Sequence, residues 1–567
     1  MLHAISLISL GLVYQTPIKL DYVATPLKTV LADVEGQTGL KLSGGPLANQ
    51  PVIVSVKSMT SKVFLDQLAK ALDAQWEMQG DTLRLSRGPG QVRAAQDRES
   101  AERATWLKDA MLKVADRKKE SEDWSDAAIQ KRKDEDDRRR AEILKNIGGD
   151  GNMVIDVVGS SGISPADLFV VEAMRRTPTN LLSSIQPGQR VVFSNFPNRM
   201  QRTLPYASSK IAEFVKAYNK LAIQTPAETG SATIRLNDSR SPRGKAQING
   251  VAELLMIAQR YGDLLQITVL AVGQTGDILG RGMATLSPPA LADGVVPDFA
   301  KGEAVLSEAS KKLVRALQSG SAQQNTFGFQ LDIGGGVTGS FETAESASPG
   351  VALPKDLQAQ LSQPATNEPL ATFPSEVMKQ TSELTGKDLI AVLPDSAFAT
   401  LAKRLATGKI KIADLYKAAP HLGVTISGSD VIVVTPRVQA QADRTNINRV
   451  ELQSLLTGFV KNGYSRLDDV CRYSLKMPEP VDTNLDSVLL RMVSPIIAQQ
   501  LSPHQLGHYR LYGALTPAQK QVDRNQVAIA YTQMDAIQKS LTEGVIYRAG
   551  GMQMFGDGEM MMVTARS

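Results

Sequence analysis

The chain has 567 residues, which at about 100–200 residues per domain predicts several domains, and its 42% hydrophobic and 21% charged residues allow each domain to bury a core. The net charge of +5 is too small over this length to indicate nucleic-acid binding. The single cysteine, Cys471, excludes an intramolecular disulfide framework and a multi-cysteine zinc site, and four histidines leave little room for a His-rich metalloenzyme.

Residues 1–15 form the most membrane-like segment of the sequence. Leu7–Val13 has the length of a short signal-peptide core, although no Lys or Arg precedes it and Val13 and Gln15 occupy positions where small residues would mark a cleavage site. No stretch reaches the roughly 18 apolar residues that a transmembrane helix needs. We therefore expect a signal peptide at 1–15 and no transmembrane span. The alternative is a first buried strand.

Residues 17–88 predict a compact unit with the order β-α-β-β-α-β-β. Apolar residues alternate from Ile18 to Tyr22, which indicates a half-buried strand, and Pro26 is suited to a helix start. Val52–Val56 is rich in β-branched residues, as strands are. A second helix follows, and Gly80-Asp81 predicts the turn of a closing hairpin.

Residues 97–147 predict a charged helical linker. The stretch 97–145 contains fourteen basic and fourteen acidic residues in blocks of alternating sign, and few apolar ones. A long solvated helix or helical hairpin is the simplest interpretation, and a charged docking arm is the alternative.

Residues 152–343 predict a mixed α/β domain. Leu264–Val272 and Ile278–Leu286 flank a glycine-rich turn and predict a β-hairpin, Ile211–Tyr218 predicts an amphipathic helix, and Phe327–Ile333 alternates like a strand. An enzyme of unknown class with its site in 152–343 is one alternative function for the chain.

The C-terminal part divides into three segments. Residues 344–370 have the Pro, Ser, Ala and Gln composition of a linker. Residues 371–436 predict a second compact unit that closes in a hairpin at Gly428-Ser429-Asp430. Residues 437–567 are mostly helical in pattern. The predicted fold class is therefore α+β and multi-domain, with two small βαββαββ-type modules, a charged helical linker, a mixed α/β centre and a helical tail.

The unit at 17–88 has a recognisable order of short signals. Pro26-Leu27 starts a helix, Thr38-Gly39-Leu40 forms a turn, a valine-rich strand and a leucine-rich helix follow, and the hairpin closes at Gly80-Asp81. This run resembles the short N-terminal domain shared by secretins and TonB-dependent receptors. Residues 371–436 resemble it more weakly, as a second copy.

The resemblance implies a periplasmic module that binds protein partners or copies of itself and does no chemistry. Physical chemistry agrees, because an open sheet edge offers unpaired N–H and C=O groups to another chain. We therefore predict a non-enzymatic, exported bacterial envelope protein acting in protein–protein interaction within a secretion, pilus or uptake assembly. It would use no cofactor, metal or nucleic acid, and strand edges would support self-association. A cytosolic scaffold that uses the charged helix is a further alternative.

Individual residues give weak signals for chemistry, and no phosphate loop, GxSxG or HExxH motif is present. Cys471 is interpreted as a buried small hydrophobe and His421 as a structural residue near a helix end. The other candidates are each better explained by a turn, by packing or by the surface: the glycines 334–336, His504 and His508, Asp468 and Asp469, and five methionines between 552 and 562.

Overall fold

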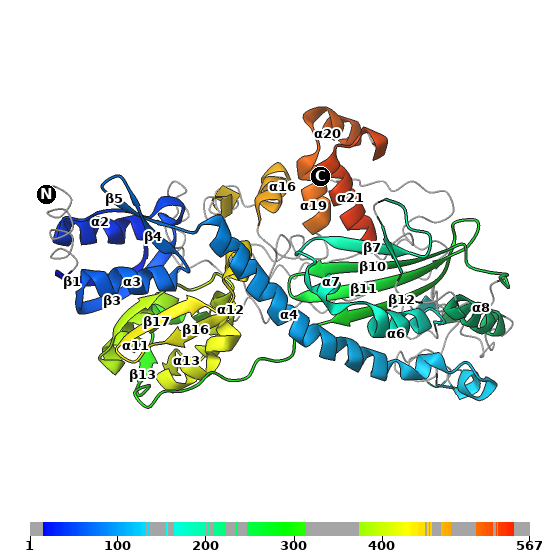
Figure 1. Cartoon of the computed structure of the whole chain (residues 1–567), viewed down its shortest axis with the longest axis horizontal. Helices are drawn as coiled ribbons and strands as arrows, with labels where there is room; N and C mark the ends of the chain where they lie inside the picture. The colour runs from blue at the N-terminus through cyan, green and yellow to red at the C-terminus, as the bar shows by residue number, and fades with distance from the viewer. Residues whose placement is uncertain are drawn as a thin grey trace, which may run out of the picture.

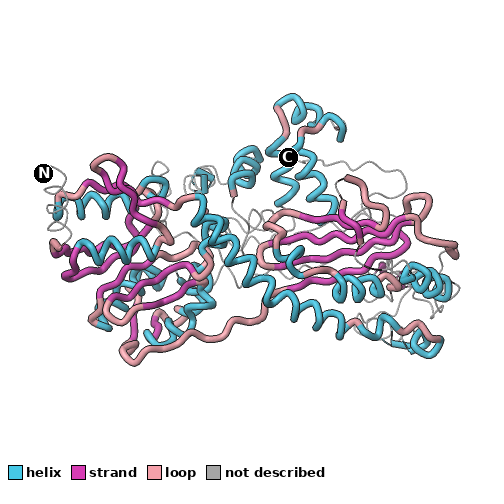
Figure 2. Tube along the Cα trace, in the orientation of Figure 1, coloured by secondary structure: helices cyan, strands magenta, loops and turns pink. Residues whose placement is uncertain are grey.

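Two large five-stranded sheets, each packed with helices, dominate the molecule (Figure 1, Figure 2). The computed structural model describes residues 15–131, 164–199, 201–204, 209–222, 246–312, 373–447, 467–477, 506–524 and 531–548, with a few shorter pieces such as 155–156 and 234–235. The predicted α+β, multi-domain fold class is confirmed. The predicted signal peptide at 1–15, apart from Gln15, the predicted strand at 327–333 and the predicted linker at 344–370 lie outside the described residues.

The first compact unit has the predicted β-α-β-β-α-β-β order. The helix α2 ends at Gly39, whose φ of +76° favours glycine, and the Thr60 side chain caps α3 by accepting a hydrogen bond from the Val63 N–H. A short 3₁₀ turn, η1 (Gly45–Leu47), precedes β3. The elements are β1 (Pro17–Pro26), α2 (Leu27–Thr38), β2 (Lys41–Ser43), β3 (Pro51–Thr60), α3 (Ser61–Ala71), β4 (Gln75–Gln79) and β5 (Thr82–Ser86).

The second unit has the order α-β-α-β-α-β-β, with a 3₁₀ turn η3 (Ala419–Leu422) before its closing hairpin. Gly386, with φ of +69°, follows its first helix, a position that favours glycine. The elements are α11 (Phe373–Thr385), β14 (Asp388–Ala391), α12 (Ala397–Arg404), β15 (Lys409–Lys411), α13 (Ile412–Ala418), β16 (Val424–Ser427) and β17 (Val431–Pro436).

The two units share one sheet, which we call sheet I. Its strand order is β1-β3-β14-β17-β16, and β14 pairs antiparallel with β3 and parallel with β17. The strand β3 needs this second neighbour because Val52, Ile53 and Val54 are all buried, a pattern typical of a strand covered on both faces. The sequence predicts two modules, whereas the strands of both form a single sheet.

The hydrophobic cores on the two faces of sheet I mix residues from both units. Ile390 and Val433 pack with the helices α2 and α3 of the first unit, while Ile53 packs with α11 and α12 of the second. Helices therefore cover both faces (Figure 1). Neither unit has a complete core without the other.

The second large sheet, sheet II, lies in the stretch of chain between the two halves of sheet I. Its order is β12-β11-β10-β7-β8, and the predicted hairpin 264–272/278–286 is confirmed. Helix α6 packs closely on β12, where a Cβ at Gly282 would lie 2.6 Å from the Ala166 carbonyl oxygen. The elements are α6 (Asp167–Arg176), α7 (Thr179–Ser183), β7 (Arg190–Ser194), β8 (Arg202–Thr203), α8 (Ser209–Ala222), β10 (Glu253–Tyr261), β11 (Leu264–Val272) and β12 (Ile278–Leu286), with β6 (Ile155–Asp156) pairing β9 (Ile234–Arg235) beside them.

Two connections cross between the sheets. Helix α4 (Pro89–Arg117) leaves the first unit and packs on α6, α7 and β12. The extended segment 287–302 returns and leads into β13 (Glu303–Val305), which pairs with β15 (Figure 1). Sheet II is therefore an insertion into the domain built on sheet I.

The predicted helical tail is present in the described part of the C-terminal region. Thr516 and Gln519 form a reciprocal cap at the start of α20, where a hydroxyl residue directly before Pro517 is typical of a helix start. The helices are α14 (Gln439–Thr445), α16 (Leu467–Lys476), α19 (Leu506–Ala514), α20 (Pro517–Arg524) and α21 (Ala536–Arg548).

Candidate functional site

The strand β4 is an exposed edge of the small sheet β2-β5-β4. Its five residues pair with β5 in an unbroken register, and Met78 is 56% exposed. Trp76 attaches the hairpin to α3, because its indole N–H donates a hydrogen bond to the Leu65 carbonyl oxygen at 2.9 Å. A regular, uncovered strand anchored by one aromatic residue can accept a further strand.

The edges of sheet I are less suited to strand addition. Register shifts break the pairing of β1 with β3 at two places, and Ala24 within β1 has a φ of +51°. Such bulges twist an edge away from regular pairing. The opposite edge, β16, has only four residues. Among these edges β4 is therefore the best candidate for contact with a second chain.

The alternation of an antiparallel hairpin shows which β4 groups are available. Gly80 and Asp81 form a two-residue turn, so the flanking pair Gln79 and Thr82 exchanges both hydrogen bonds. The N–H groups of Trp76 and Met78 then point away from β5. These outward groups form the hydrogen-bonding edge that an added strand would use.

Helix α4 confirms the helix predicted for the charged segment, but the helix is not solvated all round, because it buries one face. Seven of its side chains are buried along one stripe, at spacings of three or four residues except for the adjacent Val114 and Ala115. The charged residues in the stripe are buried because they are paired, which sequence composition alone does not reveal. The stripe consists of Ala95, Glu99, Arg103, Leu107, Met111, Val114 and Ala115.

Glu99 is the centre of a buried ion cluster at the junction of the two domains. Its Oε1 accepts hydrogen bonds from Arg103 at 2.6 Å, from Arg260 of β10 at 2.7 Å and from Arg444 of α14 at 2.7 Å. Its Oε2 accepts a second bond from Arg444 at 2.6 Å. Arg260 is only 1% exposed. One carboxylate thus links α4, sheet II and the segment that follows sheet I.

Two effects set the pKa values in this cluster: burial, which disfavours the charged form of each group, and the charges of the neighbouring groups. Burial alone would raise the pKa of Glu99, but hydrogen bonds and charge from Arg444 and Arg260 outweigh it and hold the pKa at about 2. Burial and the neighbouring Arg260 lower the pKa of Arg103 to about 10. At neutral pH all four groups are charged, so the cluster is a fixed ionic junction.

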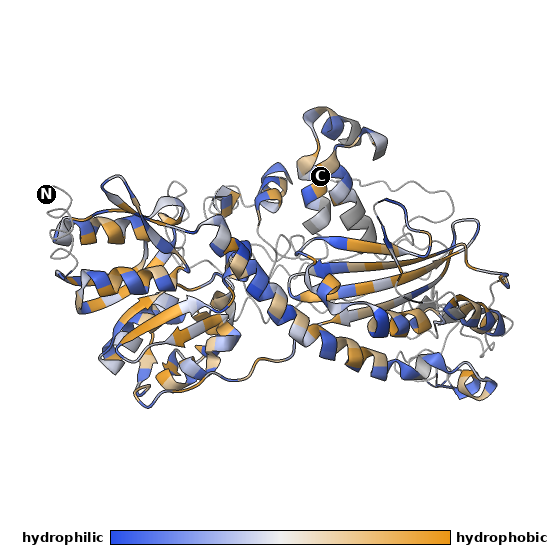
Figure 3. Cartoon of the chain, viewed as in Figure 1, coloured by the Kyte–Doolittle hydropathy of each residue, from blue (hydrophilic) through white to orange (hydrophobic). Residues whose placement is uncertain are grey.

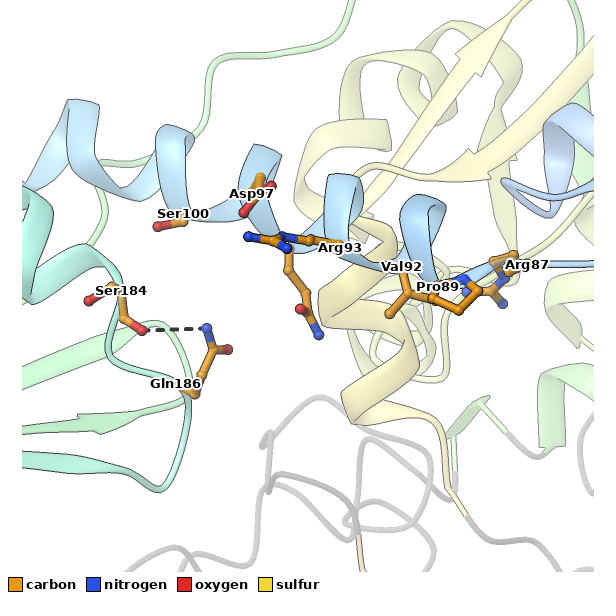
Figure 4. A pocket seen from close by; sticks show the side chains of 9 residues that line it. Arg87, Pro89, Val92, Arg93, Asp97, Ser100, Ser184 and Gln186 are labelled. Carbon is orange, nitrogen blue, oxygen red and sulfur yellow. Dashed lines mark hydrogen bonds between the residues drawn. The ribbon is translucent and has the colours of Figure 1, made fainter.

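Cavities surround the exposed faces of α4 where it crosses the junction. A groove of about 580 Å³ lies between the start of α4 and the turn after α7 (Figure 4). Arg87, Arg93 and Asp97 line it from the side of α4, and Ser184 and Gln186 line it from the other side. A cavity of about 530 Å³, the junction cavity, lies between α4, the segment 287–302 and the start of α14.

The residues that the sequence suggested for chemistry do not come together in the described part of the chain. His421 contacts Asp293, with Nε2 and Oδ1 3.3 Å apart, and Asp468 and Asp469 pair with Lys520 and Arg472. No three His, Cys, Asp or Glu side chains gather as a metal site would require in the part of the chain that the structure describes. The glycines 334–336, the side chains of His504 and His508, and the methionines 552–562 lie outside the described residues.

Cys471 is fully buried in α16, as the sequence predicts. Burial raises the pKa of its thiol to about 12, so the thiolate population at neutral pH is negligible. We expect a disulfide reagent to leave the native thiol unmodified for hours and to modify it within minutes in denaturant, as release of the coloured thiolate would show. Rapid labelling of the native protein would contradict this burial.

Comparisons with family models, curated proteins and solved structures give no match. The described helices include none that is both long and apolar enough to cross a membrane. The longest of the described helices, α4, mixes hydrophilic and hydrophobic residues, whereas the strands of both large sheets are mostly hydrophobic (Figure 3).

Proposed function

We propose that the chain is a non-enzymatic, exported bacterial envelope protein whose work is protein–protein interaction, in a secretion, pilus or uptake assembly. The observation that carries the proposal is the exposed, regular edge of β4. The resemblance of 17–88 to the short N-terminal domain of secretins and TonB-dependent receptors supports the compartment and the class of assembly.

The partner expected at β4 is an extended segment of another protein or of a second copy of the chain. Main-chain groups of Trp76 and Met78 would supply the hydrogen bonds, and the exposed side chain of Met78 would contact an apolar residue of the partner. Methionine suits such a contact because its flexible thioether adapts to different neighbours.

Photocrosslinking in cells tests the proposal. A photoreactive residue replacing Glu77 on β4 is expected to give a discrete higher-mass adduct in the periplasmic or outer-membrane fraction. The same residue replacing the exposed Lys62 on α3 serves as the positional control and is expected to give none. An adduct of twice the chain mass would identify a second copy as the partner.

A proline substitution separates strand addition from general proximity. Met78→Pro removes an outward N–H while leaving the pairing with β5 intact, and edge strands tolerate proline. We expect Met78→Pro to abolish the Glu77 adduct and Met78→Leu to retain it, with both variants unfolding in urea near the wild-type midpoint. An adduct that persists in Met78→Pro, or that forms equally when the photoreactive residue replaces Lys62, would contradict the proposal.

A further inference from the structure

The junction cavity has two chemically different walls. Trp106 of α4 and Pro288, Pro289 and Leu291 of the returning segment form an apolar wall. Leu291 is 38% exposed although it lines a cavity between two domains. Prolines make this wall rigid, because their φ angles are fixed. Cavities of this size at domain interfaces are common positions for small-molecule sites.

The opposite wall is polar, and its charges already have partners. Glu102 pairs with Arg437, and the Gln441 side-chain amide donates to Asp263 at 2.8 Å. Glu99, deeper in the cavity, is surrounded by Arg103, Arg260 and Arg444, and Asp263 lies 3.9 Å from Arg260. Each exposed carboxylate of the wall therefore already has a partner, so a strongly charged ligand would have to displace an existing contact.

This polar wall still has hydrogen-bonding capacity. The carboxylates of Glu102 and Asp263 are 47% and 49% exposed, and each uses only part of its acceptor capacity. Arg437 uses one terminal nitrogen on Glu102, which leaves donors on the same planar group. The Glu102 carboxylate and the Arg437 guanidinium thus place planar acceptors and donors beside each other, where they can form hydrogen bonds with two neighbouring hydroxyl groups of one ligand.

We propose that the junction cavity binds a neutral saccharide. A pyranose ring has an apolar face of C–H groups, which fits against Trp106 and the proline wall, and hydroxyl groups that both donate and accept, which fit the polar wall. A charged ligand would have to disrupt the Glu102–Arg437 pair, and a purely apolar ligand would leave the polar wall without hydrogen bonds. This binding site is separate from the β4 edge and does not depend on the function proposed for that edge.

Tryptophan fluorescence and calorimetry on the full chain test the proposal. The probes are cellobiose, maltose and N,N′-diacetylchitobiose, with glucose 6-phosphate and hexanol as charged and apolar comparisons. At least one neutral disaccharide is expected to give a saturable fluorescence change that Trp106→Phe removes and Trp124→Phe retains. Asp263→Asn is expected to weaken its binding at least tenfold, whereas Glu77→Gln on β4 leaves it unchanged.

Three results would overturn the proposal. They are the absence of saturable binding of all three disaccharides up to 50 mM, binding that Trp106→Phe and Asp263→Asn leave unaltered, and tighter binding of the phosphorylated sugar or of hexanol. Because Trp106 also packs on the core around sheet II, the Asp263→Asn variant provides a test that does not depend on that packing.

Discussion

We expect Ile390→Ala to destabilise the domain built on sheet I by about 2–5 kcal/mol, the usual cost of truncating a fully buried aliphatic side chain. Ile390 belongs to β14 but packs in the core of the first unit, so the loss should be felt across 17–88 as well as in its own unit. Urea unfolding, with hydrogen exchange of β3 and α3 as the local readout, measures both effects. Leu384→Ala on α11, where the side chain is 46% exposed, should change the stability by about 0.5 kcal/mol or less.

An excised fragment of residues 17–88 tests, without a substitution, whether the first unit depends on the core that it shares with the second. It would expose the β3 edge that β14 covers and would lack Ile390, Val392 and Val433 from its core. We expect the fragment to have weak exchange protection in β3 that rises on adding a fragment of residues 371–447. A fragment that is fully protected alone would show that the first unit is an independent module, as the sequence-based prediction has it.

Local elements could be predicted from the sequence because their signals lie within a few residues. Pro26 before α2, Gly39 after it, Gly386 after α11 and the hairpin turn at Gly80 each act on the nearest turn of backbone. The hairpin β11–β12 follows for the same reason. These positions agree with the structure because tertiary contacts reinforce the local preference.

Pairing between distant segments could not be predicted in this way. The β3–β14 ladder joins Val54 to Ile390, and nothing in either strand specifies its partner beyond β-branched residues on both faces. The continuous burial of Val52–Val54 signals a central strand, but not the residues beside it. The strand β10, which carries Arg260, was not predicted at all.

The ion cluster around Glu99 could not be predicted for a related reason. The stripe on α4 contains Glu99 and Arg103 between apolar residues. Charged residues are expected to be solvent-exposed unless they have a buried partner, and the sequence does not show which residues are the partners. Their partners Arg260 and Arg444 are 161 and 345 residues away from Glu99. The signal that the sequence does contain is a regular interval of four residues, which places Ala95, Leu107 and Met111 on the same helix face as these charged residues.

Glu99→Gln is the second substitution with a large expected effect. It should lower the free energy of unfolding by about 3–5 kcal/mol, which is typical when one partner of a buried ion cluster is removed. Arg103, Arg260 and Arg444 would remain close together with an amide in place of the carboxylate that offsets part of their charge. Glu102→Gln is the matched control three residues along α4. Because Glu102 is 47% exposed, its ion pair with Arg437 should contribute about 1 kcal/mol or less.

The pH dependence of the same variant distinguishes an ionic junction from simple packing. The pKa of Glu99 is about 2 in the folded chain against an ordinary value of 4.5, so its stabilisation is complete above pH 4.5 and is lost as the pH falls towards 2. The difference corresponds to about 3 kcal/mol. Urea unfolding of the wild type between pH 5 and 2 should show this loss, and Glu99→Gln should show a loss smaller by that amount. Equal losses in the two proteins would mean that the arginines do not depend on the Glu99 charge, and that the junction between the domains is held by its apolar neighbours instead.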